Sequence, residues 1–167
     1  MKPKKQMFEE STRQLLDQVN NMSLPAMQRI QAKNFVLLFR DAFKSDDVKR
    51  ATFSQTIGDD YQMFPYDSYG FCKASSCAFV SLMPPRAWRV MYIDDLWTYG
   101  PHYYVQNVAT GQILDMTFDQ YKYDGVAVPY HMGRPVKIDA EARNTAVRFL
   151  HAVGLDFSAL LNNNEKV

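Results

Sequence analysis

The sequence predicts an α+β fold in which a helix that carries a cysteine packs on an antiparallel sheet. Amphipathic helical patterns fill most of the first 44 residues and return near the C-terminus. Between them, residues 88–93, 102–108 and 112–117 have the composition of strands. The last two strands flank the short turn at Ala109-Thr110-Gly111 and are therefore expected to form a hairpin.

The N-terminal helices are predicted from their apolar stripes. Residues 7–20 place Phe8, Leu15, Leu16 and Val19 on or near one face. Residues 25–44 begin with Pro25, which suits the first turn of a helix. Their stripe consists of Met27, Ile30, Phe35, Leu38, Phe39 and Phe43. We expect a single domain, with residues 1–50 as a helical segment packed on an α+β core of residues 51–161. An arm that binds a partner is the alternative interpretation.

The middle of the chain leads to a cysteine. Ser45-Asp46-Asp47 predicts a short helix or a turn, and residues 52–68 are expected to form an irregular loop rich in Asp, Tyr and Pro. A tight turn is expected at Gly70, with Cys72 at or beside the start of the next helix. That helix is expected to end at Pro84-Pro85.

The C-terminal third completes the predicted fold. Residues 130–138 are expected to form a loop or an edge strand. Asp139 is expected to cap a final helix over residues 140–153, and Gly154 to end it.

Composition excludes several classes of function. The chain of 167 residues has a net charge of +1 and no basic stripe, so we predict no nucleic-acid partner. No apolar run approaches the roughly 18–20 residues of a membrane span, and no secretory signal is visible, so we predict no membrane partner and a cytoplasmic location. The two cysteines, Cys72 and Cys77, would point about 140° apart on one helix, which favours free thiols. No metal-ligand motif is visible, and we predict no metal and no cofactor.

Three residues suggest nucleophilic catalysis. A helix start favours a thiolate over a thiol, and Cys72 has this position. A nucleophilic cysteine needs a base and a group that orients the base, and His102 and Asp115 lie on the two strands of the hairpin. The loop length predicts that Asp115 lies opposite Tyr104 and diagonal to His102; a shift of one residue would change its face. Asp119 is an alternative orienting acid, whereas Cys77 reads as a small buried apolar residue.

Three motifs resemble a known family. They are Gly70-Phe71-Cys72-Lys73-Ala74-Ser75-Ser76, His102-Tyr103-Tyr104, and residues 111–121, which read Gly-Gln-Ile-Leu-Asp-Met-Thr-Phe-Asp-Gln-Tyr. They are similar to small bacterial and phage proteins of the papain-like and transglutaminase-like cysteine-enzyme superfamily. Met116 departs from that pattern, where the family often has Pro, and Cys77 departs where a polar residue is common. The resemblance covers about residues 68–150.

This resemblance implies a papain-like, transglutaminase-like fold and a triad of Cys72 as nucleophile, His102 as base and Asp115 as orienting acid. It implies a location in a bacterial cell or a phage-infected host. Papain-like enzymes also use a side-chain amide upstream of the cysteine at the oxyanion, and Gln62 is the nearby candidate.

The leading hypothesis is therefore a cysteine-dependent hydrolase of the peptidase or amidase type that acts on an amide or isopeptide bond of a peptide or protein substrate. Transglutamination, deamidation or acyl transfer with the same triad is an alternative. Another alternative is a catalytically silent binding protein that modulates a host protein. Tyr69, Trp97 and Tyr99 are predicted to bind substrate. The oligomeric state stays open.

Overall fold

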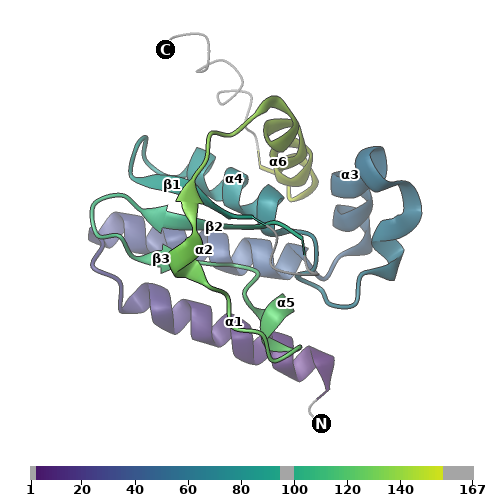
Figure 1. Cartoon of the computed structure of the whole chain (residues 1–167), viewed down its shortest axis with the longest axis horizontal. Helices are drawn as coiled ribbons and strands as arrows, with labels where there is room; N and C mark the ends of the chain where they lie inside the picture. Colours follow the sequence, from purple (N-terminus) through teal and green to yellow (C-terminus); the bar gives the residue numbers. More distant parts are fainter. Residues whose placement is uncertain (1–2, 95–99, 156–167) are drawn as a thin grey trace.

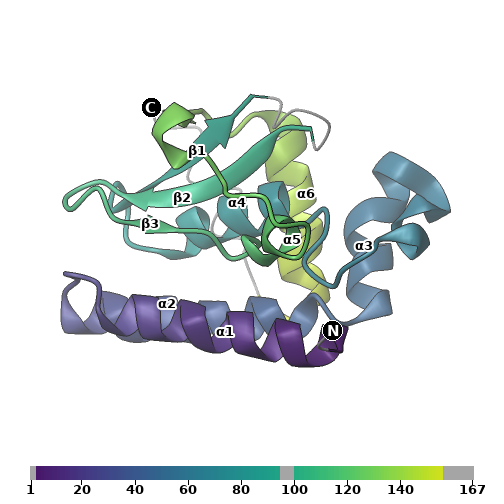
Figure 2. The ribbon, with the colours of Figure 1, turned by 60° about the horizontal axis from the view of Figure 1, so that its bottom comes forward.

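The computed structural model describes residues 3–94 and 100–155 (Figure 1). The chain begins with two antiparallel helices, α1 (Lys4–Asn20) and α2 (Ala26–Ala42), which lie side by side along one side of the molecule (Figure 2). Phe8, Leu15 and Val19 are buried on α1, in agreement with the predicted stripe. On α2 the stripe is only partly inward, because Met27 and Ile30 are exposed while Ala32 and Val36 are buried.

The next segment is more helical than the sequence suggested. Helix α3 (Asp46–Ile57) is followed by the 3-10 helix η1 (Gly58–Met63), so the prediction of an irregular loop from residue 52 is wrong for residues 52–63. Ser45 caps α3 by accepting a hydrogen bond from the Val48 N–H. Tertiary packing explains the extra length, since Thr52 and Phe53 are buried and the Arg148 side chain donates to the Thr52 carbonyl at 3.1 Å.

Four antiparallel strands form the sheet, in the order β3-β2-β1-β4. They are β1 (Trp88–Ile93), β2 (His102–Asn107), β3 (Ile113–Leu114) and β4 (Arg134–Pro135). The predicted bounds of β1 are confirmed, while β3 is shorter than expected. Val105 lies opposite Leu114. Continued by one residue, this register puts Asp115 opposite Tyr104, as the loop length predicted.

The C-terminal half adds short elements and one long helix. Helix α5 (Asp119–Lys122) and the 3-10 helix η2 (Tyr130–Met132) lie between β3 and β4. Helix α6 (Ala140–Ala152) is capped by Asp139, which accepts from the Ala142 N–H at 2.7 Å. Gly154 follows α6 with a φ of 79°. The predicted cap and end of this helix are confirmed.

Helix α4 (Cys72–Leu82) lies at the centre of the fold (Figure 2). It contacts β1 and β2 through one side and α6 through another. Phe79 on α4 packs edge-on against Trp88 of β1 and against Phe35 of α2. The N-terminal helices, α4, α6 and one face of the sheet thus share one apolar core. A smaller cluster formed by Met91, Ile93, Tyr104 and Tyr121 lies apart from it.

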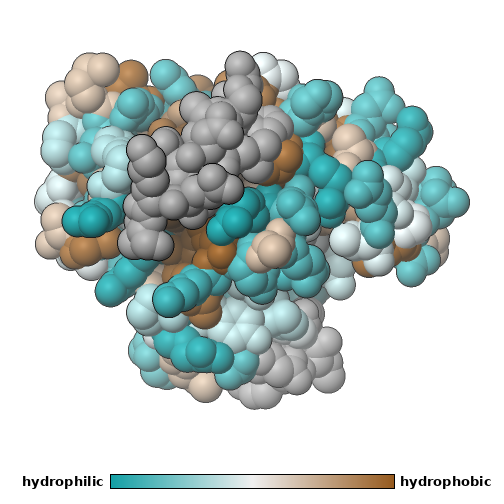
Figure 3. All heavy atoms as spheres, turned by 90° about the horizontal axis from the view of Figure 1, so that it is seen from above, coloured by the Kyte–Doolittle hydropathy of each residue, from teal (hydrophilic) through white to brown (hydrophobic). Residues whose placement is uncertain are grey.

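The observed fold is α+β, with six α-helices and one four-stranded antiparallel sheet among the described residues. The face shown in Figure 3 is mostly hydrophilic, with smaller hydrophobic areas between the polar side chains. Within residues 3–94 and 100–155, no helix is long and apolar enough to cross a membrane.

Candidate active site

Cys72 is the first residue of α4, and the turn before it explains this position. Gly70 has a φ of 80°, a conformation that favours glycine, and it reverses the chain just before the helix. Phe71 is fully buried, and its carbonyl accepts the hydrogen bond from the Ser75 N–H that begins the helix. Cys72 itself is half-buried. The structure therefore places the thiol at a helix start, as the sequence predicted, within reach of solvent.

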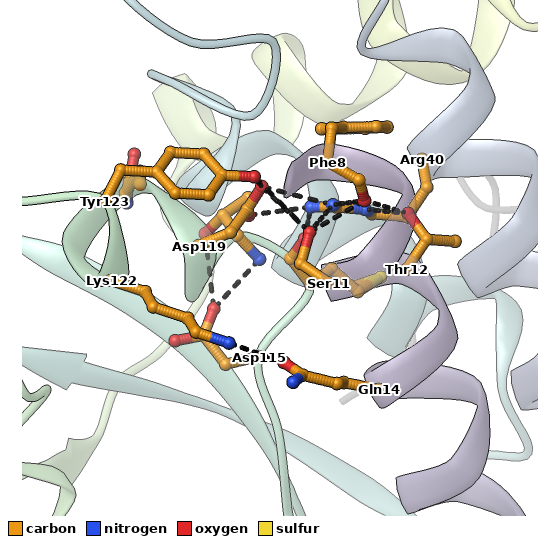
Figure 4. Close-up of polar contacts among 12 residues, drawn as sticks. Phe8, Ser11, Thr12, Gln14, Arg40, Asp115, Asp119, Lys122 and Tyr123 are labelled. Atoms are coloured by element: carbon orange, nitrogen blue, oxygen red, sulfur yellow. Dashed lines mark hydrogen bonds and ion pairs between the residues drawn. The ribbon is translucent and has the colours of Figure 1, made fainter. Parts of the chain in front are cut away.

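His102 and Asp115 form a direct pair. The imidazole Nε2 lies 2.7 Å from Oδ2 of Asp115, and both side chains are buried. The alternative acid, Asp119, pairs instead with Arg40 at 2.7 Å (Figure 4). Among the described residues, Asp115 is thus the carboxylate that holds His102. Because a carboxylate accepts hydrogen bonds, this contact keeps a proton on Nε2 and leaves Nδ1 as the nitrogen that gains or loses one.

The Asp115 carboxylate is saturated with donors. Oδ2 accepts from His102 and from the Tyr130 hydroxyl at 2.8 Å, and Oδ1 accepts from the Thr117 N–H and hydroxyl at 3.0 and 3.2 Å. Burial on its own would raise the pKa of Asp115. The charge of His102 and these hydrogen bonds outweigh that effect and lower the pKa below the ordinary value. Asp115 is therefore ionised at neutral pH.

Two side chains that the sequence did not suggest as site residues lie at the other imidazole nitrogen. The Tyr121 hydroxyl is 3.0 Å from Nδ1 of His102, and the Gln120 amide nitrogen is 3.3 Å from it. Both residues belong to α5 and both are buried. Their only sequence signal was their place at the end of the third motif, five and six residues after Asp115.

The pKa of His102 depends on both Asp115 and Cys72. Burial would lower the pKa of the imidazole, but the Asp115 charge, its hydrogen bond and the contact with the Cys72 side chain raise it to about 10. At neutral pH, His102 is thus an imidazolium held by the Asp115 carboxylate. The three residues chosen from the sequence are brought together.

Cys77 differs from Cys72 in its surroundings. It lies one and a half turns further along α4 and is only 1% exposed. Burial raises the pKa of its thiol to about 12, so it is protonated at neutral pH.

The remaining predicted site residues have different outcomes. Gln62 is exposed on η1, and the described hydrogen bonds do not join it to Cys72 or His102. Tyr69 is 38% exposed, and it packs on Phe64. Burial raises the pKa of Tyr121, and the nearby Tyr69 phenol contributes in the same direction. Trp97 and Tyr99 lie outside the described residues.

Two concave regions lie near this cluster. A groove of about 620 Å³ between α1 and the segment after β3 is lined by Gln14, Gln18, Phe118, Asp115 and Tyr130, among others. A smaller hollow of about 230 Å³ is lined by residues that include Lys73, Cys77 and Tyr103. Within the described residues, no group of three His, Cys, Asp or Glu side chains is arranged to hold a metal ion.

The smaller hollow is not lined by Cys72, His102 or Asp115, and its β2 residue, Tyr103, points to the face of the sheet opposite to His102. Burial raises the pKa of Tyr103 to about 12.

Comparisons with models of protein families, with curated proteins and with solved structures find no match. The papain-like and transglutaminase-like resemblance therefore stays a prediction. What the cluster can do is argued below from its own geometry.

Proposed function

We propose that this protein is a cysteine-dependent hydrolase of the peptidase or amidase type, with Cys72 as nucleophile, His102 as base and Asp115 as orienting acid. One observation carries the proposal: the buried His102 is bonded to Asp115 through Nε2 and also interacts with Cys72. A base fixed by an acid and facing a thiol at a helix start is the arrangement that nucleophilic catalysis needs. The resemblance of three motifs to cysteine enzymes points in the same direction.

The proposed reaction starts with His102 in its protonated form. The Cys72 thiolate attacks the carbonyl carbon of an amide, a C–S bond forms, and the π electrons of the carbonyl move to its oxygen. When the tetrahedral intermediate collapses, the C–N bond breaks, and the proton on Nδ1 of His102 goes to the leaving amine. A water then loses a proton to Nδ1 and attacks the thioester, which releases the acid and restores the thiolate.

The developing oxyanion needs donors. The backbone N–H of Cys72 lies in the first turn of α4, where N–H groups have no acceptor within the helix. Gln62 was the predicted second donor, but its exposed position on η1 makes it a weaker candidate than the buried side chains at Nδ1. Tyr121 is the better candidate: while its oxygen accepts from the imidazolium, its own O–H can donate to the oxyanion.

The Gln120 amide must adapt to the protonation state of His102. An imidazolium has no acceptor nitrogen, so only the amide oxygen can face Nδ1 while His102 is charged. When Nδ1 has given up its proton, the amide NH₂ can donate to it instead. Gln120 can thus bond Nδ1 both before and after proton transfer.

The reactivity of the two cysteines tests the proposal. We expect iodoacetamide at pH 6.5 to alkylate Cys72 at least about 100-fold faster than Cys77, because Cys77 is buried and protonated. Peptide mass spectrometry after timed quenching measures both sites in one sample. His102→Gln should slow Cys72 about tenfold or more, and should leave Cys77 unchanged.

Acylation provides the second arm of this test. With p-nitrophenyl acetate, intact mass spectrometry should detect an acetyl thioester on the wild-type chain and none on Cys72→Ala. Equal alkylation of the two cysteines, or an unchanged Cys72 rate in a folded His102→Gln variant, would overturn the proposal. Hydrolysis by Cys72→Ala at the wild-type rate would do so as well.

A further inference from the structure

A second buried polar cluster lies where the N-terminal helices meet the rest of the molecule (Figure 4). Its centre is Arg40 of α2, which is 1% exposed, paired with Asp119 of α5, which is fully buried. The guanidinium donates to both carboxylate oxygens, at 2.7 and 3.1 Å. Tyr123 donates to the same carboxylate at 2.9 Å. The two partners of this ion pair are 79 positions apart in the chain.

Arg40 also contacts α1 and the segment after β3, and since six acceptors face its five N–H groups, one N–H of Nη2 is shared between two acceptors. It donates to the Phe8 carbonyl, to the Ser11 hydroxyl and to the Thr12 hydroxyl of α1. It also donates to the Met116 carbonyl at 3.0 Å. Figure 4 shows Ser11 and Thr12 of α1 and Asp119 of α5 gathered around the Arg40 guanidinium.

This arrangement is not needed for stability alone. A buried ion pair loses about as much in desolvation as it gains in attraction, and apolar residues of similar volume are often as stabilising. The planar guanidinium instead fixes the positions of its partners, because its N–H groups donate in fixed directions and each acceptor must lie along one of them.

The segment that Arg40 fixes is the one that surrounds His102. Met116 directly follows Asp115, and Asp119 directly precedes Gln120 and Tyr121. Through the Met116 carbonyl, Arg40 thus holds the backbone next to Asp115, the partner of Nε2. Through the Asp119 carboxylate, it holds the residue next to the two partners of Nδ1. Helix α5 has only four residues, so it has little rigidity of its own.

We propose that Arg40 is a positioning residue for the imidazole: through Asp119 and the Met116 carbonyl it holds residues 115–121 so that both ring nitrogens of His102 keep their partners. It makes the N-terminal helices a part of the active site's support. This inference rests on the proposed function for its catalytic meaning, but the geometry that it predicts does not depend on any activity.

The test compares Arg40→Met with Val36→Ala, a core substitution on the same helix that removes buried apolar volume and no hydrogen bond. Uniformly ¹⁵N-labelled protein gives the imidazole nitrogen signals of His102, assigned by their loss in His102→Gln. We expect Arg40→Met to move the pH midpoint of these signals down by at least one unit and to slow alkylation of Cys72 about tenfold. Val36→Ala should move the pH midpoint by no more than a few tenths of a unit. It should change the alkylation rate of Cys72 by less than about twofold.

Two further variants keep the test decisive if Arg40→Met folds poorly. Arg40→Lys retains the charge but not the fork, and should move the histidine signals in the same direction. The double variant Arg40→Met with Asp119→Leu removes both buried charges, and should fold stably yet still lose the orientation. Histidine signals in these variants that match those of Val36→Ala would overturn the positioning role. If Cys72 is unreactive in the wild-type chain, the proposed function fails, while the histidine signals still test Arg40.

Discussion

His102 is a fully buried side chain that carries a charge at neutral pH. Burial opposes the charge, and the Asp115 carboxylate together with the Cys72 contact outweighs this opposition, so that the pKa rises to about 10. The same pair lowers the pKa of Asp115. Each shift means that folding favours the charged form, so each contributes stability that depends on pH.

The sign of that dependence follows from the two shifts. The raised pKa of His102 gives a stabilisation that is complete below about pH 6.5, its ordinary value, and is lost as the pH rises to about 10. The lowered pKa of Asp115 gives a stabilisation that is present above about pH 3.8 and is lost at lower pH. The contribution of the pair is therefore greatest between about pH 4 and 6.5.

We predict that the free energy of unfolding of the wild-type chain, relative to His102→Gln, falls by a few kcal/mol between pH 6.5 and 10. Urea unfolding at several pH values, followed by circular dichroism, measures this difference. His131→Gln is the control, because His131 is exposed on η2 and its removal should leave the curve unchanged. A difference that stays flat from pH 6.5 to 10 would show that His102 is not held as an imidazolium.

At the scale of elements, the turn before α4 decides where the thiol lies. A Cβ atom added to Gly70 would lie 2.9 Å from Cε2 and Cζ of the Phe64 ring, and its φ of 80° is unfavourable for any other residue. Gly111, in the β2–β3 loop, has a similar φ of 72° but open space around it. Substitutions at the two glycines can therefore separate the cost of backbone strain, which both share, from the cost of the steric contact, which only Gly70 has.

We predict that Gly70→Ala lowers the free energy of unfolding by about 2–4 kcal/mol, whereas Gly111→Ala lowers it by only about 1 kcal/mol. Because Gly70 lies two residues before Cys72, we also expect slower alkylation of Cys72 in Gly70→Ala alone. Chemical unfolding and the iodoacetamide assay measure the two effects. Equal effects of both substitutions would mean that the Phe64 contact relaxes at no cost.

Local signals explain which elements were predictable. The hairpin register follows from a turn of known length and a side-chain period of two, so Asp115 was placed correctly opposite Tyr104. The bounds of β1 and the Asp139 cap of α6 have equally local causes. The full length of α3 has no such local cause, since its second half is held by packing against α6 rather than by its own sequence pattern.

Long-range contacts explain what was missed at the site. Gln120 and Tyr121 reach His102 because α5 lies against the start of β2, which no local pattern encodes. Arg40 looked like one basic residue on an amphipathic helix, and its partner Asp119 looked like a rival for Asp115. The sequence thus identified the residues with a chemical role more readily than those that position them.

At the scale of the whole molecule, one aromatic cluster joins the N-terminal helices to the rest. Phe149 of α6 packs against Phe39 of α2 and against Phe43, the residue that follows α2, with ring centroids 4.9 and 6.0 Å apart. It also packs against Phe71, the residue before Cys72, at 5.5 Å. Phe43 stacks on the same Phe71 ring at 4.4 Å. The helix start that carries the thiol is therefore fixed from α2 and α6 at once.

This shared interior predicts that the chain unfolds in one cooperative step, because α1 and α2 cannot separate without exposing the rings that hold α4 and α6. Phe149→Ala should lower the free energy of unfolding by about 3–5 kcal/mol, the usual cost of an aromatic truncation in a closed core. Asn144→Ala, at an exposed position on the same helix, should change it by less than about 0.5 kcal/mol.

Hydrogen exchange followed by NMR measures the same property residue by residue. The most protected amides of α2, α4 and α6 should exchange with one common free energy in the wild-type chain, and Phe149→Ala should lower all three together. If α1 and α2 opened at a lower free energy than α4, the N-terminal helices would form a separate unit. In that case Arg40 would hold residues 115–121 only while that unit is closed, and the reactivity of Cys72 should fall at the denaturant concentration where α2 opens rather than where the sheet unfolds.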